Sequence, residues 1–126
     1  MELAGKTAFK AAGIQDPNNE IDVAELFEAH AHEELIFTES LGLAEKGKGA
    51  DLNTEIGGDF PVNPSGGALG GNPLCATGLI RIIEAVKQIK GEAKGYQVNG
   101  AKKAIASGQI GMCAQNNILY VLEGSD

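Results

Sequence analysis

One stretch decides the expected fold: residues 61–91 read PVNPSGGALGGNPLCATGLIRIIEAVKQIKG. Residues 61–73 contain three prolines and four glycines, a composition typical of a tight turn or of backbone that approaches a ligand closely. The remainder predicts a helix that begins at Pro73 and ends near Gly91. Its apolar residues have helical spacing and form one stripe: Leu79, Ile82, Ile83, Val86 and Ile89.

The rest of the chain places this helix in a layered domain. The patterns predict helices at 2–12 (ended by Gly13) and 28–41, strands at 21–27, 101–106 and 118–122, a turn at 16–19 and a long loop at 43–60. The last strand is nearly all apolar, which predicts that it is covered on both faces. We therefore expect a single α/β domain over residues 1–126, with a mixed sheet layered with helices.

Charge and composition exclude several classes of function. The 126 residues carry a formal net charge of −7, so a nucleic-acid binder is not expected. The apolar stretches are far shorter than the roughly 20 residues that cross a bilayer, and no signal peptide opens the chain, so we expect a cytoplasmic protein without membrane contact. Five carboxylates are predicted to form a solvated acidic face: Asp22, Glu25, Glu28, Glu33 and Glu34.

The glycine-rich turn is the first candidate for a ligand site. Backbone N–H groups at a helix start face whatever lies in front of them, and Gly66, Gly67, Gly70 and Gly71 let a ligand approach. No Lys-Ser/Thr pair follows, and the GxGxxG spacing is missing, so neither a phosphate loop nor a dinucleotide site is expected. A purely structural turn stays open as the alternative.

The histidines and cysteines are the other candidates. Helical spacing turns His30 and His32 to different faces, so no metal site is expected. His30 is then either an exposed or capping residue or an acid/base group. Cys75, in the first turn of the long helix, is predicted to be a buried, inert thiol. Cys113, between the last two strands, is either buried or reactive.

Residues 61–80, PVNPSGGALGGNPLCATGLI, resemble the signature of the thiolase family, particularly its sterol-carrier-protein thiolase and lipid-transfer protein branch. In that family a paired-glycine turn leads into Gly-His-Pro and a helix that begins with small residues. AAGIQDPNNEIDVAELFEAHAHEEL, residues 11–35, resembles the family's Gly-Ile turn, its Asp-Val-x-Glu-Leu strand and its Asn-Glu-Ala-Phe or His-Asp-Cys-Phe motif. Residues 91–123 resemble the closing strands.

The resemblance implies the C-terminal half of the thiolase fold. The acyl-accepting cysteine and most coenzyme A contacts of the family lie in an N-terminal portion that has no counterpart here. The implied function is part of an acyl-CoA acyltransferase that makes or breaks a carbon–carbon bond beside a thioester. It would be inactive alone, act in a homo- or hetero-oligomer with that portion, and use the thioester as substrate without a cofactor. The alternatives are a non-catalytic acyl-CoA or lipid-binding or assembly module, and part of a retro-aldolase with a zinc-ribbon/OB-fold partner.

Two family positions are changed. Asn72 stands where the family has the histidine of Gly-His-Pro; an amide cannot accept the proton, but it can donate a hydrogen bond to a thioester oxygen. Phe27 replaces the asparagine of Asn-Glu-Ala-Phe, and His30 stands at its phenylalanine. Cys113 lies two or three residues after the family's second cysteine. The resemblance thus implies Asn72 as a polar contact and His30 and Cys113 as candidates for proton transfer, with the four glycines lining the pocket.

Overall fold

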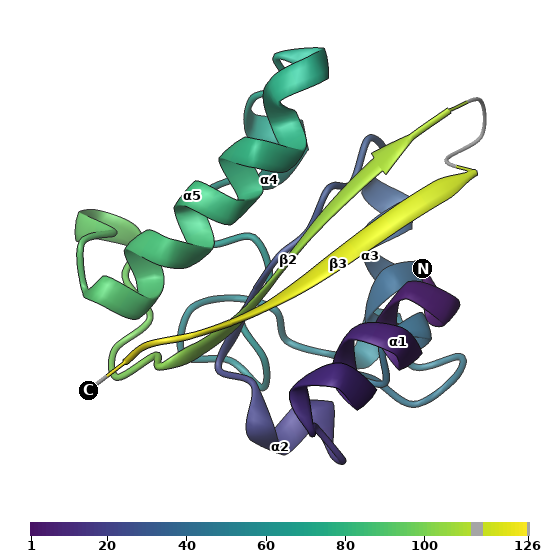
Figure 1. Cartoon of the computed structure of the whole chain (residues 1–126), viewed down its shortest axis with the longest axis horizontal. Coiled ribbons are helices and arrows are strands. Elements are labelled where there is room, and N and C mark those ends of the chain that lie inside the picture. The colour runs from purple at the N-terminus through teal and green to yellow at the C-terminus, as the bar shows by residue number, and fades with distance from the viewer. Residues whose placement is uncertain (112–114, 126) are drawn as a thin grey trace.

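A three-stranded mixed sheet forms the centre of the computed structural model, which describes residues 1–111 and 115–125. Strand β1 (Val23–Glu25) runs parallel to β2 (Lys103–Ile110), and β2 pairs antiparallel with β3 (Asn116–Glu123), in the order β1-β2-β3 (Figure 1). The predicted α/β class and mixed sheet are confirmed.

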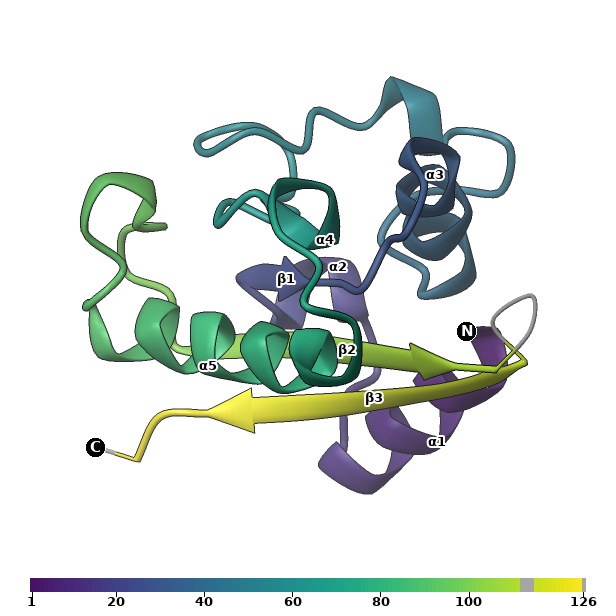
Figure 2. The same cartoon turned by 90° about the horizontal axis from the view of Figure 1, so that it is seen from above.

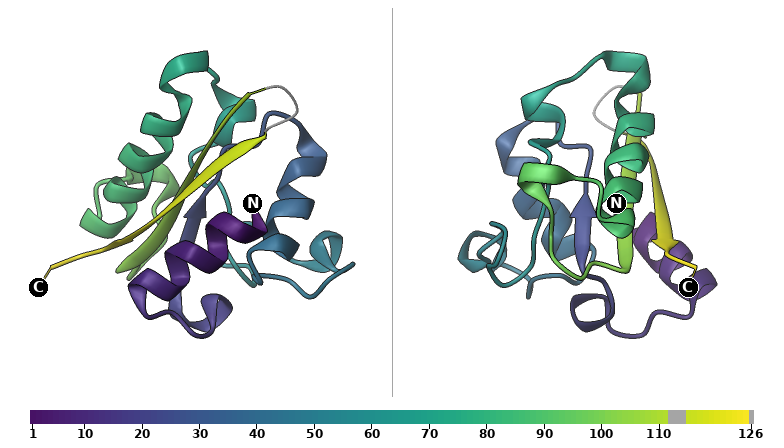
Figure 3. Two further views of the ribbon diagram at one scale, coloured as in Figure 1. Left: turned by 45° about the vertical axis from the view of Figure 1, so that its right-hand side comes forward. Right: turned by 90° about the vertical axis from the view of Figure 1, so that its left-hand side faces the viewer.

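Helices flank the sheet on two sides. Helices α1 and α3 lie on one side and α5 on the other, while the short α4 lies near the end of β1 (Figures 1 and 2). Two further views show the same layers (Figure 3). The helices are α1 (Glu2–Ala12), α2 (Pro17–Glu20), α3 (Ala31–Ser40), α4 (Gly67–Gly70) and α5 (Thr77–Lys90), with 3₁₀ turns at Gly49–Asp51, Leu74–Ala76 and Lys94–Tyr96.

The helix ends follow the local chemistry. Helix α1 ends, as predicted, at Gly13, whose φ of 75° is in the left-handed region that glycine tolerates. Pro17 is the first residue of α2 in the segment predicted as a turn. The long helix begins later than expected because Leu74 has a φ of 41°, and a 3₁₀ turn precedes Thr77.

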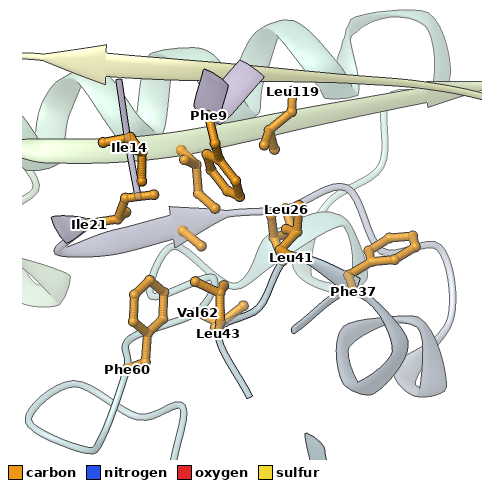
Figure 4. Close-up of a cluster of buried hydrophobic side chains, with 12 residues drawn as sticks. Phe9, Ile14, Ile21, Leu26, Phe37, Leu41, Leu43, Phe60, Val62 and Leu119 are labelled. Carbon is orange, nitrogen blue, oxygen red and sulfur yellow. The ribbon is translucent and has the colours of Figure 1, made fainter. Parts of the chain in front are cut away.

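The two sides of the sheet have different cores. On the α1 side, Ile105 and Leu119 of the sheet belong to a cluster of large buried side chains that includes Phe9, Phe37 and Phe60 (Figure 4). On the α5 side the buried cluster consists of one valine and four alanines: Val23, Ala85, Ala101, Ala104 and Ala106. The first cluster supplies most of the apolar burial, and the second lets α5 lie close to the sheet.

Strand β3 is the edge of this sheet, so the prediction that it is covered on both faces is wrong. Leu119 is buried against the α1 side, whereas Ile118 and Tyr120 are 48% and 42% exposed. The reason is that α5 packs mainly over β2 and leaves the same face of β3 partly open. Within residues 1–111 and 115–125, every helix is too short or too polar to cross a bilayer.

Candidate functional site

Two buried carboxylates lie at the end of β1 and just beyond it. Strand alternation directs Ala24 and Leu26 into the α1-side cluster and turns Val23 and Glu25 toward α5. Glu25 is 0% exposed and Glu28 is 1% exposed. The predicted solvated acidic face is therefore wrong for these two residues, because packing places them inside the protein.

Glu25 is part of a buried polar cluster with Arg81 of α5 and Ser65. One guanidinium nitrogen of Arg81, Nη1, lies 2.8 Å from Glu25 Oε2 and 2.8 Å from Ser65 Oγ, and the Ser65 hydroxyl donates to Glu25 over 2.6 Å. Burial raises the pKa of Glu25 to about 7, although the Ser65 hydrogen bonds and the Arg81 charge oppose that rise. This cluster joins β1, α5 and the segment that enters the glycine-rich turn.

Glu28 contacts the next part of the same turn. Its carboxylate accepts hydrogen bonds from Asn63 Nδ2 at 2.5 Å and, more weakly, from the backbone N–H of Leu69 at 3.4 Å. Burial raises the pKa of Glu28 as well. The Asn63 side chain also accepts from the backbone N–H of Leu26 at 2.6 Å, so it ties the turn to the end of β1.

The predicted substrate-binding glycines have two kinds of surroundings. Gly66 and Gly67 have φ values of 96° and 61°, and a Cβ at Gly67 would overlap the Glu28 carboxylate. Glycine is required at Gly67 by both conformation and space. Gly70 and Gly71 are exposed, and nothing within 4 Å would meet a Cβ there. The first pair anchors the turn, and the second pair offers open backbone.

Asn72 ends the turn in an exposed position. Its Oδ1 accepts a hydrogen bond of 2.6 Å from Oγ1 of Thr77, which is fully buried. Thr77 and Arg81 are four residues apart and share one face of α5. The same helix face therefore holds Asn72 at one end of the turn and Ser65 at the other.

His30 lies two residues after Glu28 and precedes α3 as its N-cap. The backbone N–H groups of Ala29 and His30 donate to Glu33 at 2.5 and 3.1 Å, and both histidines are exposed. The prediction that His30 and His32 point to different faces is wrong, because His30 lies outside the helix. Their rings stack, with centroids 5.5 Å apart.

The cysteines divide between the exposed and the undescribed parts of the chain. Cys75 is exposed in the 3₁₀ turn before α5, so its predicted burial is wrong. Cys113 lies outside the described residues. Among the residues that are described, no three His, Cys, Asp or Glu side chains form a group that could hold a metal ion.

Phe27, at the changed family position, is held through its backbone. Its N–H donates to Ser107 Oγ and its carbonyl accepts from Gln109 Nε2, both at 2.8 Å. The phenyl ring supplies no hydrogen-bond donor at a position where the resemblance has an amide. Ser107 and Gln109 were not singled out from the sequence; their only signal is that they interrupt an apolar strand.

Two further residues of the site, Arg81 and Thr77, were not singled out from the sequence. Arg81 lies on the sheet-facing side of α5 and is 3% exposed, so its charge needs a partner. Glu25 is the one charged residue of β1, and its buried charge needs a partner for the same reason. Pairing Glu25 with Arg81 would have predicted the cluster. The assembled site presents the exposed Asn72 side chain and the open backbone at Gly70 and Gly71, and two buried carboxylates hold its turn.

Comparison with known proteins identifies the family. The thiolase C-terminal domain-like family matches residues 1–123, so the chain belongs to this family, as the resemblance predicted. It is 40% identical to human sterol carrier protein 2 over 107 residues, which are 81% of this chain and 19% of that protein. It is 41% identical to the acetyl-CoA acetyltransferase of Methanothermobacter thermautotrophicus over 104 residues, which are 79% of this chain and 27% of that enzyme.

A solved structure has the same fold. The Ltp2-ChsH2(DUF35) aldolase superposes with a TM-score of 0.73 and 29% sequence identity, over 84% of this chain and 28% of the other. The present chain therefore spans only a fifth to a little over a quarter of the proteins that it matches.

Proposed function

We propose that this chain supplies the C-terminal part of an acyl-CoA site in a thiolase-like enzyme that makes or breaks a carbon–carbon bond beside a thioester. The observation that carries the proposal is the anchoring of the glycine-rich turn: Arg81 and Glu25 hold Ser65, Glu28 holds the backbone at Leu69, and Thr77 holds Asn72. A turn fixed at three points while Gly70 and Gly71 stay open is suited to positioning a ligand.

Each candidate residue has a role in this proposal. The Asn72 amide donates a hydrogen bond to the thioester oxygen, while Gly70 and Gly71 allow the ligand to approach the backbone. His30, exposed near Glu28, is the candidate for proton transfer, and Cys113 stays a second candidate on sequence grounds. The thioester is the substrate, no cofactor is required, and the cytoplasmic location expected from the sequence remains part of the proposal.

The remaining portion of the thiolase fold is the proposed partner. On the outer face of α5, Leu79, Ile83 and Val86 are 60%, 45% and 38% exposed, and their spacing places them on one stripe. On β3, Ile118 lies next to Gly108 and is 48% exposed, so the edge strand adds a further uncovered apolar side chain. An apolar surface of this kind is suited to a large, lasting interface with the N-terminal portion, within a homo- or hetero-oligomer.

A specific observation favours a second candidate function. Phe27 and Asn72 replace the family's asparagine and histidine, so the two groups associated with Claisen-type chemistry are both changed. The chain also shares its fold with the Ltp2-ChsH2(DUF35) aldolase. Part of a retro-aldolase with a zinc-ribbon/OB-fold partner is therefore the alternative enzyme, and a non-catalytic acyl-CoA or lipid-binding or assembly module is the alternative binder.

Calorimetric titration tests these proposals. Acetyl-CoA and a longer acyl-CoA are titrated into the chain alone and into the chain combined with an N-terminal thiolase portion. Binding and thiolysis only in the combined sample support the split site, whereas binding to the chain alone supports the binding module. Release of an aldehyde or ketone from a β-hydroxyacyl-CoA supports the retro-aldolase. Asn72→Ala should weaken binding, and Asn99→Ala, at another exposed asparagine, is the matched control; equal affinities would contradict the role of Asn72.

A further inference from the structure

The two ends of the Asn72 side chain offer opposite chemistry to a ligand, because Nδ2 donates hydrogen bonds and Oδ1 accepts them. We propose that Thr77 is a positioning residue that holds the Asn72 side chain at the end of the turn, with Oδ1 toward α5 and the NH₂ group left for a ligand. The inference rests on the proposed function for its consequence, but its geometry is independent of any activity.

The contact between the two side chains is direct. Thr77 Oγ1 donates to Asn72 Oδ1 over 2.6 Å, and within the described chain Asn72 Nδ2 has no hydrogen-bond partner. In this arrangement Oδ1 points to Thr77, and the NH₂ group is the end left for a ligand. The exposed end of Asn72 therefore presents donors, and it favours an oxygen acceptor such as a thioester carbonyl or the enolate that forms from it.

Thr77 is itself fixed in space. It is 0% exposed, and Gly78, the next residue, lies against β2, where a Cβ built on it would be in van der Waals contact with Gly108 Cα at 3.4 Å. One turn further on, Arg81 is held by Glu25 and Ser65. The hydroxyl that orients Asn72 therefore belongs to a helix end that cannot move away from the sheet without breaking buried contacts.

The anchoring of Asn72 by Thr77 can be tested by nuclear magnetic resonance on the full chain. We expect the side-chain NH₂ of Asn72 to be as ordered as the surrounding backbone, and that of the exposed Asn99 to be mobile. Thr77→Val keeps the shape but removes the hydroxyl, so the Asn72 NH₂ should become as mobile as that of Asn99, while Thr77→Ser should preserve the order. Equal order in wild type and Thr77→Val, or a mobile Asn72 amide in the wild type, would overturn the inference.

The consequence for function is tested in the sample combined with the N-terminal thiolase portion, with acetyl-CoA as the probe. Thr77→Val should lower kcat/KM by up to roughly tenfold, the scale of one neutral hydrogen bond, and Thr77→Ser should restore it. Asn72→Asp keeps an acceptor for Thr77 but removes the donor, so its kcat/KM should fall as far as that of Asn72→Ala. A lower kcat/KM in Asn72→Ala with an unchanged kcat/KM in Thr77→Val contradicts the positioning role of Thr77. An unchanged kcat/KM in every Asn72 variant contradicts the proposed function of Asn72, even where the resonance data confirm that Thr77 holds its side chain.

Discussion

The α1 layer and the α5 layer pack on the same sheet in opposite ways. Helix α1 buries Phe9, as expected of an amphipathic helix on a hydrophobic core. Its Gly5 lies so close to Leu41 that a Cβ built on Gly5 would be 2.7 Å from Leu41 Cδ2. Helix α5 instead buries Thr77, Arg81 and Gln88 and exposes an apolar stripe.

This difference separates a layer that supplies the hydrophobic core from a layer whose side chains hold the segments of the candidate site. The α1 side resembles the core of an ordinary globular protein. On the α5 side, polar side chains face inward because they hold other segments: Arg81 holds the glycine-rich turn, Thr77 holds Asn72, and the Gln88 amide bonds the backbone of Tyr96 and Val98. Leu79, Ile83 and Val86 face outward, where the proposed partner would cover them.

The largest expected effect comes from breaking the buried ion pair on the α5 side. Arg81→Met leaves Glu25 buried without a cation, and we expect the free energy of unfolding to fall by about 3–5 kcal/mol in urea titrations. The double variant Glu25→Leu/Arg81→Met should recover most of that loss, since both charges are removed together. Lys87→Met, at the more exposed Lys87–Glu84 pair, is the control and should cost under about 1 kcal/mol. A similar cost for both single variants would remove the distinction between the layers.

The glycine-rich turn gives the next largest effect. Gly67→Ala places a Cβ against Glu28 at a φ of 61°, so we expect a loss of about 1–3 kcal/mol in the same titrations and weaker acyl-CoA binding in the combined sample. Gly70→Ala has open space and no positive φ, and it should leave stability within about 0.5 kcal/mol of wild type. Equal costs at both positions would show that Glu28 does not hold the turn.

The buried carboxylate Glu25 on the α5 side should also make the free energy of unfolding depend on pH. Burial raises the pKa of Glu25 from 4.5 to about 7, so between these values the folded chain retains a proton that the unfolded chain releases. The free energy of unfolding should therefore fall as pH rises from about 5 to 7, by at most about 1.4 kcal/mol per pH unit for this residue, and level off above that range. Glu28 contributes in the same direction. Glu25→Leu/Arg81→Met should reduce the slope; an unchanged slope would assign it to other groups.

The outer stripe of α5 gives the smallest effect on folding. Leu79→Lys/Ile83→Lys replaces side chains that are 60% and 45% exposed, so the free energy of unfolding of the isolated chain should change by no more than about 1 kcal/mol. Light scattering should show self-association of the wild-type chain and loss of that association in the variant. A monodisperse wild-type monomer would contradict the proposed interface.

Much of the fold was predictable because its signals are local. The helix-forming composition of α1 and its stop at Gly13 depend on neighbouring residues, and the family resemblance is carried by contiguous motifs. Positions that depend on partners were not predictable from pattern. An apolar β3 and a carboxylate-rich segment near β1 were assigned to the wrong environments because composition does not say which element covers which face.

For the site, the sequence by itself determined the family, the glycine-rich turn and the unusual Asn72. Only the tertiary structure decided that Glu25 meets Arg81, 56 residues away, and that Glu28 meets Asn63, 35 residues away. The physical reason is that a hydrogen bond or a buried ion pair needs its atoms within about 3 Å and in alignment. Such distances between segments far apart in the chain are set by how α5 packs on the sheet, and no local pattern encodes them.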